Sequence, residues 1–131
     1  MSKKYKIAFL IFLTGGITYG AIELLWRGFT HPVMFFAGGI SALLLCLIAV
    51  KVTQLHFLYK VVFGSLAITA VELVFGLIFN IGLKMNIWDY SILKFNFLGQ
   101  ICVLFSVLWG FLCVGAIPLA ERLFYALQNR C

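Results

Sequence analysis

The stretch VVFGSLAITAVELVFGLIFNIGL (residues 61–83) decides the fold, because it is long enough and apolar enough to cross a lipid bilayer. A helix needs about 20 apolar residues to span a hydrocarbon core of about 30 Å. Three further stretches meet this condition, at residues 7–25, 33–50 and 97–119. The sequence therefore predicts an all-α fold, a polytopic transmembrane four-helix bundle that forms one integral membrane domain over residues 1–131.

The composition places the chain among membrane proteins. Hydrophobic residues make up 64% of it and charged residues 11%, with a mean hydropathy of +1.12. Soluble domains have about 45–50% apolar and about 25% charged residues. Since so few polar side chains could not cover so many apolar ones, lipid must surround most of the surface. We therefore expect a multi-pass protein of the cell (plasma) membrane, with the lipid bilayer as its first partner.

The basic residues flank the predicted spans instead of forming one patch, so the net charge of +6 does not indicate binding to nucleic acid. They divide unequally between the two sides of the membrane. One side holds Lys3, Lys4, Lys6, Lys51, Lys60, Arg122 and Arg130, and the other holds Arg27, Lys84 and Lys94. Basic segments tend to stay in the cytoplasm, so both termini are expected there. Insertion in both orientations remains an alternative.

The two ends of the chain carry further signals. Residues 1–21 combine a basic start, an apolar run and small residues, and we expect an uncleaved signal anchor that forms the first span. Near the other end, Leu123, Phe124 and Leu127 recur at helical spacing. Residues 120–131 are therefore expected to form an amphipathic tail at the inner membrane surface.

A short internal sequence similarity raises the hypothesis of a duplication. AIELLW (residues 21–26) and AVELVF (residues 70–75) share Ala, Glu and Leu at matching positions. Both lie on spans that are predicted to run outward, so a duplicated two-helix hairpin related by an axis along the membrane normal would explain them. A chance match between two short apolar segments is the alternative.

Glu72 is the residue of the third span that bears most on function. An ionised carboxylate at the bilayer centre costs about 2.5–3.5 kcal/mol on insertion scales, so Glu72 must be neutral, paired or hydrated in a cavity. One interpretation is a coupling or ligand-binding carboxylate. The other is a protonated Glu72 that joins helices by hydrogen bonding to Asn80, Gln100 or a backbone carbonyl.

Small residues predict where the helices pack. Gly64, Ile68, Glu72, Gly76 and Asn80 recur every four residues and form one stripe, which should face protein or water and not lipid. Small residues in the other spans let helices approach closely in the same way. These further packing candidates are Gly16 and Gly20, which form a G-x-x-x-G pair, Gly99 and Gly110.

The secondary candidates lie nearer the predicted outer surface. Arg27 follows Glu23 by one helical turn, so a local ion pair explains both residues without a function. In the loop KMNIWDYSILKFN, Trp88 and Tyr90 are explained as interfacial aromatics, and either Asp89 or Ser91 as a cap of the fourth helix. Alternatively, this loop folds over the bundle and directs Asp89 toward a vestibule above Glu72.

No cofactor, metal site or enzymatic activity is expected. The sequence holds four cysteines without a C-x-x-C pair, and its two histidines, His31 and His56, are predicted on opposite sides of the membrane. It contains no P-loop, no G-x-S-x-G and no H-E-x-x-H motif. Any energy for transport would therefore come from an ion gradient or from a partner.

Several segments follow one another as in a known family. ELVFG (72–76), WDYS (88–91), NFLG (96–99) and LWG (108–110) resemble the putative ABC-transporter type IV family of small bacterial membrane proteins, and TYGAIELLWRG (18–28) is similar too. The resemblance implies a permease-like protein that would need a separate ATPase subunit. Its motif positions here are Glu72, Trp88, Asp89, Asn96 and Gly99, and Leu73 departs from the aromatic residue of many relatives.

The leading functional hypothesis is a transport-related membrane protein, permease-like or carrying a small solute or ion, in which Glu72 faces a polar crevice. The crevice is predicted to be lined by Asn80, Asp89, Asn96 and Gln100. Four helices leave little internal room, so the pathway would form in a homo-oligomer or with a membrane partner subunit. The alternative is a non-transporting subunit that scaffolds or regulates a larger complex. A third hypothesis is a small proton-coupled exporter, for which Glu23 is poorly placed.

Overall fold

Four helices are long enough and apolar enough to cross a membrane in the computed structural model, which describes residues 2–52 and 56–130. The elements follow in the order α1 (Lys3–Arg27), α2 (Pro32–Lys51), α3 (Phe57–Phe75), the π-helix η1 (Gly76–Gly82), β1 (Asn96–Phe97), β2 (Ile101–Cys102) and α4 (Val103–Arg130). α3 and η1 form one continuous span, Phe57–Gly82. The prediction of a helical protein with four membrane spans is confirmed. Cys131 lies outside the described residues.

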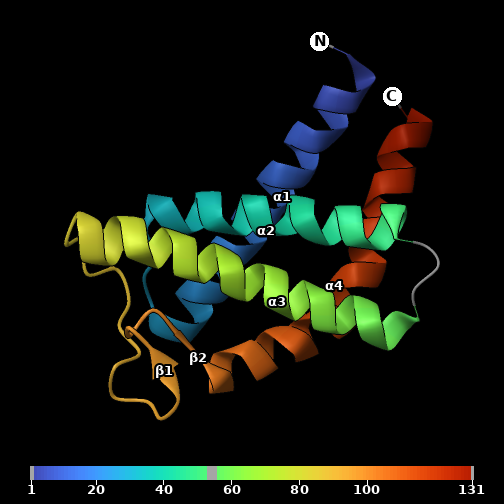
Figure 1. The fold of residues 1–131 in the computed structure, drawn as a ribbon. Coiled ribbons are helices and arrows are strands. Elements are labelled where there is room, and N and C mark those ends of the chain that lie inside the picture. Colours follow the sequence, from blue (N-terminus) through green and yellow to red (C-terminus); the bar gives the residue numbers. More distant parts are fainter. Residues whose placement is uncertain (1, 53–55, 131) are drawn as a thin grey trace.

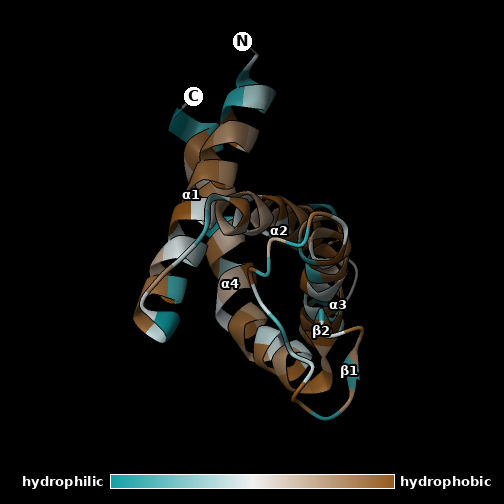
Figure 2. Ribbon diagram, turned by 90° about the vertical axis from the view of Figure 1, so that its left-hand side faces the viewer, coloured by the Kyte–Doolittle hydropathy of each residue, from teal (hydrophilic) through white to brown (hydrophobic). Residues whose placement is uncertain are grey.

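The helices are arranged as a side-by-side pair crossed by two others. α2 and α3 run alongside each other, whereas α1 and α4 cross this pair, and both chain ends lie at the same end of the molecule (Figure 1). The short hairpin of β1 and β2 lies at the other end. Hydrophilic residues gather at the chain ends and in the connections, while the helices between them are mostly hydrophobic (Figure 2). This distribution suits helices that cross a bilayer.

Two histidines begin α2 and α3. The Nδ1 atom of His31 accepts a hydrogen bond of 3.1 Å from the backbone N–H of Val33, and Nδ1 of His56 accepts one of 3.2 Å from that of Leu58. Pro32 occupies the first turn of α2, where its missing N–H costs no hydrogen bond. Both imidazoles therefore satisfy backbone groups that a helix start leaves free.

α1 packs closely on α2 because glycines remove the side chains between them. A Cβ atom at Gly16 would lie 2.6 Å from the ring of Phe35, and one at Gly38 would lie 2.5 Å from the Cβ of Tyr19. Of the predicted G-x-x-x-G pair, Gly16 is at this interface. Around Gly20, however, the described residues place no heavy atom within 4 Å of the Cβ position, so Gly20 faces no other helix of the chain.

The predicted stripe of the third span is the buried face of α3. Gly64, Ile68, Glu72 and Gly76 are all buried. A Cβ atom at Gly64 would lie 2.8 Å from the sulfur of Cys113, which shows how closely α3 approaches α4. The four-residue period therefore marks the side of this helix that faces protein.

Among the described residues, two hydrophobic clusters join helices to one another, and a third, of Met34, Ile87 and Trp88, joins α2 to the loop that follows η1. The first joins α2, α3 and α4 through Leu45, Ala49, Ile68, Cys113 and Ile117. The second joins α1 and α2 through Ile7, Ile11 and Cys46. Leu123, Phe124 and Leu127 pack against this second cluster, and the segment predicted as an amphipathic tail is helical and continuous with α4.

The fourth helix begins and ends later than predicted. Residues 97–102 belong to the hairpin and its turn, because Leu98 and Gly99 have φ angles of 55° and 72°, which a right-handed helix does not allow. Gly99 is thus a turn residue and not a helix-packing residue. α4 then continues to Arg130 with Pro118 inside it, and it bends along its length (Figure 1). Gly110 packs only loosely, since its Cβ position lies 3.9 Å from Ser65.

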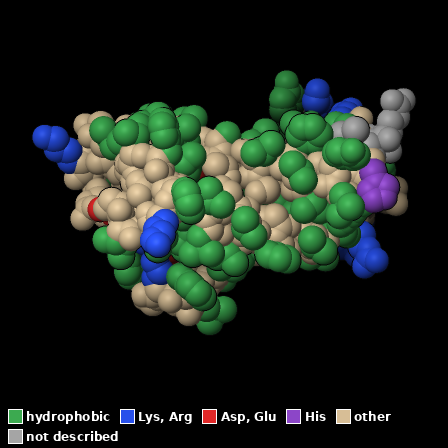
Figure 3. All heavy atoms as spheres, turned by 60° about the horizontal axis from the view of Figure 1, so that its bottom comes forward, with side chains coloured by type: hydrophobic (Ala, Val, Ile, Leu, Met, Phe, Trp, Pro, Cys, Tyr) green, Lys and Arg blue, Asp and Glu red, His purple; other side chains and the backbone are tan. Residues whose placement is uncertain are grey.

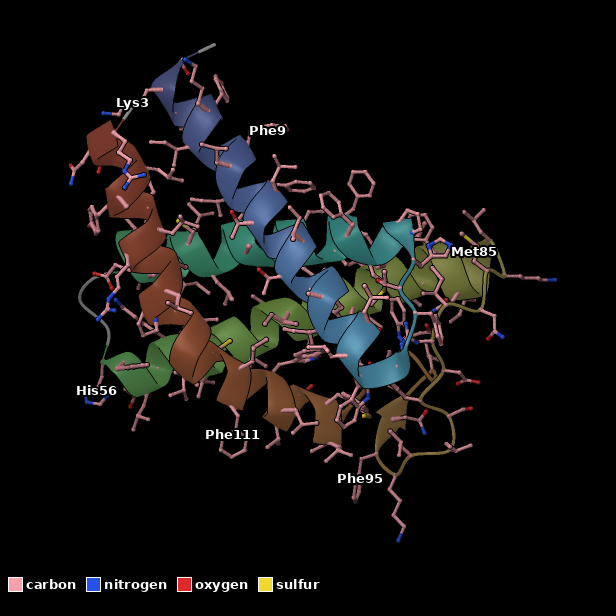
Figure 4. All side chains as sticks on the ribbon, turned by 180° about the vertical axis from the view of Figure 1, so that it is seen from behind. Lys3, Phe9, His56, Met85, Phe95 and Phe111 are labelled. Atoms are coloured by element: carbon pink, nitrogen blue, oxygen red, sulfur yellow. The ribbon has the colours of Figure 1, made fainter. Side chains whose placement is uncertain are left out.

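The outer faces of the helices are apolar. Phe9 and Phe111 point away from the bundle and are 54% and 71% exposed (Figure 4). Hydrophobic side chains are spread over the whole of the face in Figure 3, and most of its lysines and arginines lie toward the two ends. Such a surface would be poorly solvated by water and matches the hydrocarbon region of a bilayer.

Candidate functional site

The loop between η1 and α4, residues 83–102, folds back onto the bundle and is called the cap loop here. Two amides fasten it. Asn80 donates to Oε1 of Gln100 at 2.8 Å and accepts from the backbone N–H of Ile87 at 2.7 Å. Gln100 is 5% exposed and also donates to the backbone oxygen of Leu98 at 3.0 Å. Both amides thus satisfy backbone groups of the loop.

Polar residues of the WDYS and NFLG segments fix the shape of the cap loop. Nε1 of Trp88 donates to the backbone oxygen of Gln100 at 2.9 Å. The Asn96 side chain accepts from the N–H of Gly99 at 3.0 Å and donates to the backbone oxygen of Leu93 at 2.7 Å. These contacts hold the turn in which Gly99 takes its left-handed conformation.

Asp89 has a local role in the same loop. Its Oδ1 atom accepts a hydrogen bond of 2.9 Å from the backbone N–H of Ser91. The hydroxyl and the backbone N–H of Ser91 lower the pKa of the Asp89 carboxyl from its usual range. Asp89 is exposed and makes no hydrogen bond to Glu72. Its carboxylate therefore orders a turn at the surface of the loop.

Glu72 is 5% exposed and holds two hydrogen-bond donors from different parts of the chain. The hydroxyl of Tyr90 donates to Oε2 at 2.9 Å, and Nε1 of Trp109 donates to Oε1 at 2.7 Å. Burial, and then the nearby Glu72 carboxylate, raise the pKa of the Tyr90 hydroxyl, so this hydroxyl stays protonated and acts as the donor. The expected partners Asn80 and Gln100 do not contact the Glu72 carboxylate; they bond to each other.

Aromatic packing orients both donors. The ring of Tyr90 stacks on Phe105 with centroids 4.6 Å apart and planes at 9°. The ring centroids of Phe105 and Trp109 lie 6.4 Å apart, and those of Trp109 and Tyr19 of α1 lie 5.8 Å apart. Offset aromatic pairs of this kind stabilise defined ring orientations. The hydrogen bonds to Glu72 are therefore part of a rigid frame of rings.

Glu23 and Arg27 join α1 to the cap loop. Nε of Arg27 lies 2.6 Å from Oε2 of Glu23, and Nη1 donates to the backbone oxygen of Ile87 at 3.1 Å. The guanidinium also lies 4.5 Å from the ring centre of Phe29. Nη2 is buried and has no hydrogen-bond partner among the described residues. This pair thus does more than neutralise charge on its own helix, and one guanidinium nitrogen is left without a hydrogen-bond partner among the described residues.

A pocket of about 250 Å³ is lined both by the ion pair and by residues of the aromatic frame, and is called the cap pocket here. Its walls come from α1, α4 and the cap loop, with Met34 of α2. Its polar and aromatic lining residues are Tyr19, Glu23, Trp26, Arg27, Trp88, Tyr90, Phe105 and Trp109. Tyr90 and Trp109 therefore face this pocket and also donate to Glu72, which lies behind them.

The structure brings together one part of the predicted site. Glu72, Tyr90, Trp88, Glu23 and Arg27 surround the cap pocket or stand directly behind its wall. Asn80 and Gln100 fasten the loop next to this group, while Asn96 and Asp89 act inside the loop.

Trp109 and Tyr19 were not predicted as site residues. Trp109 offered a signal, because a tryptophan within a membrane span needs an acceptor for its indole N–H. Within the same span, Ser106 also bonds to Thr69 with 2.8 Å between the hydroxyl oxygens.

Four membrane-spanning helices that enclose a carboxylate and a pocket at one end define a multi-pass membrane protein. Residues 17–130 match the model of a family described as Putative ABC-transporter type IV. Because this match covers most of the chain, the protein belongs to that family, and the resemblance noted from the sequence is confirmed. Neither the curated proteins nor the solved structures gave a match to the chain.

Proposed function

We propose that this protein takes part in the transport of a small solute or ion across the cell membrane, with Glu72 as its coupling carboxylate. The observation that carries the proposal is the double role of Tyr90 and Trp109. Each donates a hydrogen bond to Glu72 and each lines the cap pocket. Membership of a transporter-type family supports the same conclusion.

The geometry suggests how solute and proton would be linked. A solute in the cap pocket would contact Tyr90 and Trp109 and compete for their hydrogen bonds. A buried carboxylate that loses a donor is less well stabilised in its charged form. Binding of a proton to Glu72 would therefore depend on occupancy of the pocket, which is the linkage that a coupled carrier requires.

Arg27 is the residue of the pocket best suited to bind solute. Its guanidinium has one nitrogen without a hydrogen-bond partner among the described residues, and the rest of the wall is mainly aromatic. Glu23 offsets its charge at 2.6 Å. The pocket is therefore suited to a small solute with both an apolar part and a hydrogen-bond acceptor.

The orientation in the membrane follows from the basic residues. Seven of them, among which are Lys3, Lys51 and Arg130, are predicted on the side of the chain ends, so both termini would be cytoplasmic and the cap pocket would open outward. As a carrier of this size, the chain would act without enzymatic activity of its own. It would work as a homo-oligomer or with a partner subunit, and a separate ATPase would be needed only for a true permease.

The similarity between AIELLW and AVELVF supports an origin by duplication of a hairpin. Glu23, through Arg27, and Glu72, through Tyr90, both connect their helices to the cap loop. Glu23 is bonded to Arg27, whereas Glu72 is bonded to neutral donors. We propose that the first copy became structural and the second functional.

The second candidate function is a non-transporting membrane subunit that stabilises or regulates a larger complex. The observation that favours it is that the polar side chains of Glu72, Asn80 and Gln100 are all bonded within the fold. Both oxygens of Glu72 and the amides of Asn80 and Gln100 fasten the cap loop or neighbouring helices. On this reading, Glu72 would be structural and the helix faces would bind partners.

A flux measurement with matched variants separates the two functions. Purified wild type, Glu72→Gln and Glu121→Gln are reconstituted into proteoliposomes, and proton flux is followed under an imposed pH gradient. Glu121 is an exposed residue of α4 and serves as the control for loss of a carboxylate. The transport proposal expects flux in the wild type and in Glu121→Gln, and its loss in Glu72→Gln with unchanged oligomeric state. Absence of flux in the wild type, with collapse of the assembly in Glu72→Gln, would favour the structural role.

A further inference from the structure

A second polar feature lies at the end of the bundle that carries the chain termini. There a groove of about 630 Å³ runs between α1, α2 and α4, and is called the terminal groove here. Its floor is apolar and includes Ile7 and Ile11 of α1, Leu47 of α2 and Phe124 of α4. The cap pocket, in contrast, is lined by residues of the opposite end, so the two sites are separate.

The rim of the terminal groove is positively charged. Lys3 and Lys4 come from the first turn of α1, and Lys51 is the last residue of α2. All three are exposed, and the described residues that line the groove include no Asp or Glu. The ion pair between Glu23 and Arg27 is the only one among the described residues, so no carboxylate of residues 2–52 or 56–130 forms an ion pair with these lysines.

The start of α1 adds to this positive potential. Ser2 precedes the helix and makes no side-chain capping hydrogen bond, and the first turn contains no acidic residue. Backbone N–H groups at a helix start point outward without partners inside the helix, and the helix dipole favours an anion there. Lys3 lies at this end of α1, beside the last turns of α4 (Figure 4).

An occupant must match both parts of the groove. A free anion would satisfy the lysines and leave the apolar floor uncovered, whereas an uncharged lipid would cover the floor and leave the lysines unpaired. An anionic phospholipid does both, and clusters of basic residues at the ends of membrane spans attract such lipids. We propose that the terminal groove binds an anionic phospholipid, with its phosphate at Lys3, Lys4 and Lys51 and an acyl chain along Ile7, Ile11 and Phe124.

Native mass spectrometry of the purified full chain tests this proposal. The protein is titrated in detergent with phosphatidylglycerol or with phosphatidylcholine, and the retained lipid is counted. The wild type is compared with the double variant Lys4→Gln, Lys51→Gln and with the charge-matched control Lys84→Gln, Lys94→Gln at the other end. Each lysine near a lipid phosphate contributes about 1 kcal/mol, so the first variant should bind phosphatidylglycerol roughly 30-fold more weakly and the control should match the wild type.

A second variant tests the apolar part of the site. Ala8 lines the groove and is only partly buried, so Ala8→Phe would occupy its floor while all lysines remain. It should weaken retention of phosphatidylglycerol at least several-fold. Equal retention of both lipids by the wild type would overturn the proposal. The proposal would also be overturned if the two double lysine variants weakened the retention of phosphatidylglycerol equally. Full competition by millimolar inorganic phosphate would overturn it as well, because it would indicate a site for a free anion.

Discussion

The hydroxyl of Tyr90 lies 2.9 Å from Oε2 of Glu72 and joins the cap loop to a carboxylate within the third membrane span. Because of this contact, the position of the loop and the protonation state of the Glu72 carboxylate depend on each other. Trp109 completes the arrangement from α4 with a hydrogen bond of 2.7 Å to the other oxygen. Three separate segments of the chain thus meet at one acidic side chain.

Removal of the Tyr90 hydroxyl should weaken the attachment of the cap loop. Tyr90→Phe keeps the ring that stacks on Phe105 but leaves Oε2 of Glu72 without its donor. A buried acceptor without a partner costs about 1–3 kcal/mol, and the free energy of unfolding in detergent should fall by that order. Tyr5→Phe is the control, because Tyr5 is 65% exposed and should show no change. An unchanged stability of Tyr90→Phe would show that this hydrogen bond contributes nothing.

The two donors should act together through Glu72. Trp109→Phe removes the indole N–H and keeps an aromatic ring near Tyr19 and Phe105. Because both donors serve one carboxylate, the double variant with Tyr90→Phe should differ from the sum of the single changes by about 0.5–3 kcal/mol. Denaturant unfolding of the four proteins in this cycle provides the measurement. Simple additivity would mean that the two contacts are independent.

Gly64 should tolerate a side chain far less well than Gly20. A Cβ atom at Gly64 would lie 2.8 Å from the sulfur of Cys113 and 2.9 Å from Cδ2 of Leu45. Gly64→Ala should therefore force α3 and α4 apart and lower the stability by about 1–3 kcal/mol. Gly20→Ala meets open space and should leave the stability unchanged or raise it. The melting temperatures of the two variants provide the measurement. Equal melting temperatures would contradict the packing described for α3.

Arg27 should hold the cap loop as well as its own helix. Arg27→Gln removes the contacts to Glu23 and to the backbone oxygen of Ile87 and leaves the buried Glu23 unpaired. The expected loss is about 1–2 kcal/mol, below that of a fully buried pair because the Arg27 side chain is 23% exposed. Hydrogen exchange across residues 83–102 should become faster. In the control Arg130→Gln, at the other end of the chain, exchange in this loop should not change.

The order of the cap loop should depend on pH through Asp89. Its pKa is lowered in the folded protein by Ser91, so this carboxylate stabilises the fold above its unfolded pKa of about 4. That contribution is lost as the pH falls through the lower folded value. The protection of the amides around Ser91 against hydrogen exchange, measured relative to the intrinsic rate at each pH, should therefore decrease in acid in the wild type, and Asp89→Ala should show low protection at every pH. A pH-independent wild type would mean that Asp89 does not order this turn.

Local patterns in the sequence were sufficient for the spans and for the buried face of α3. Hydropathy over about 20 residues reports the length of a span, and the four-residue period of Gly64, Ile68 and Gly76 reports which side faces protein. Hydropathy does not report where a helix begins. The start of α4 at Val103 depends on the left-handed conformations of Leu98 and Gly99, which belong to a turn that the apolar sequence conceals.

The partners of Glu72 could not be predicted in the same way. Tyr90 and Trp109 are distant from it in sequence, and their contacts arise only when the cap loop folds back and α4 packs on α3. Asn80 and Gln100 were attractive partners by residue type, but the backbone groups of the loop use both amides first. A buried backbone group without a partner costs about as much free energy as a lost hydrogen bond, so the backbone groups of the loop compete with the carboxylate for these amides.

Labelling of Glu72 by a water-soluble carbodiimide tests most directly whether this carboxylate communicates with the cap pocket. Carbodiimides react with protonated carboxyl groups, and peptide mapping reports modification at each residue. We predict slow labelling of Glu72 in the wild type, at a rate that increases as the pH falls. The rate should be higher in Trp109→Phe, in which one hydrogen bond to the carboxylate is missing. Complete lack of reaction at Glu72 at every pH, while the exposed Glu121 is fully labelled, would contradict it.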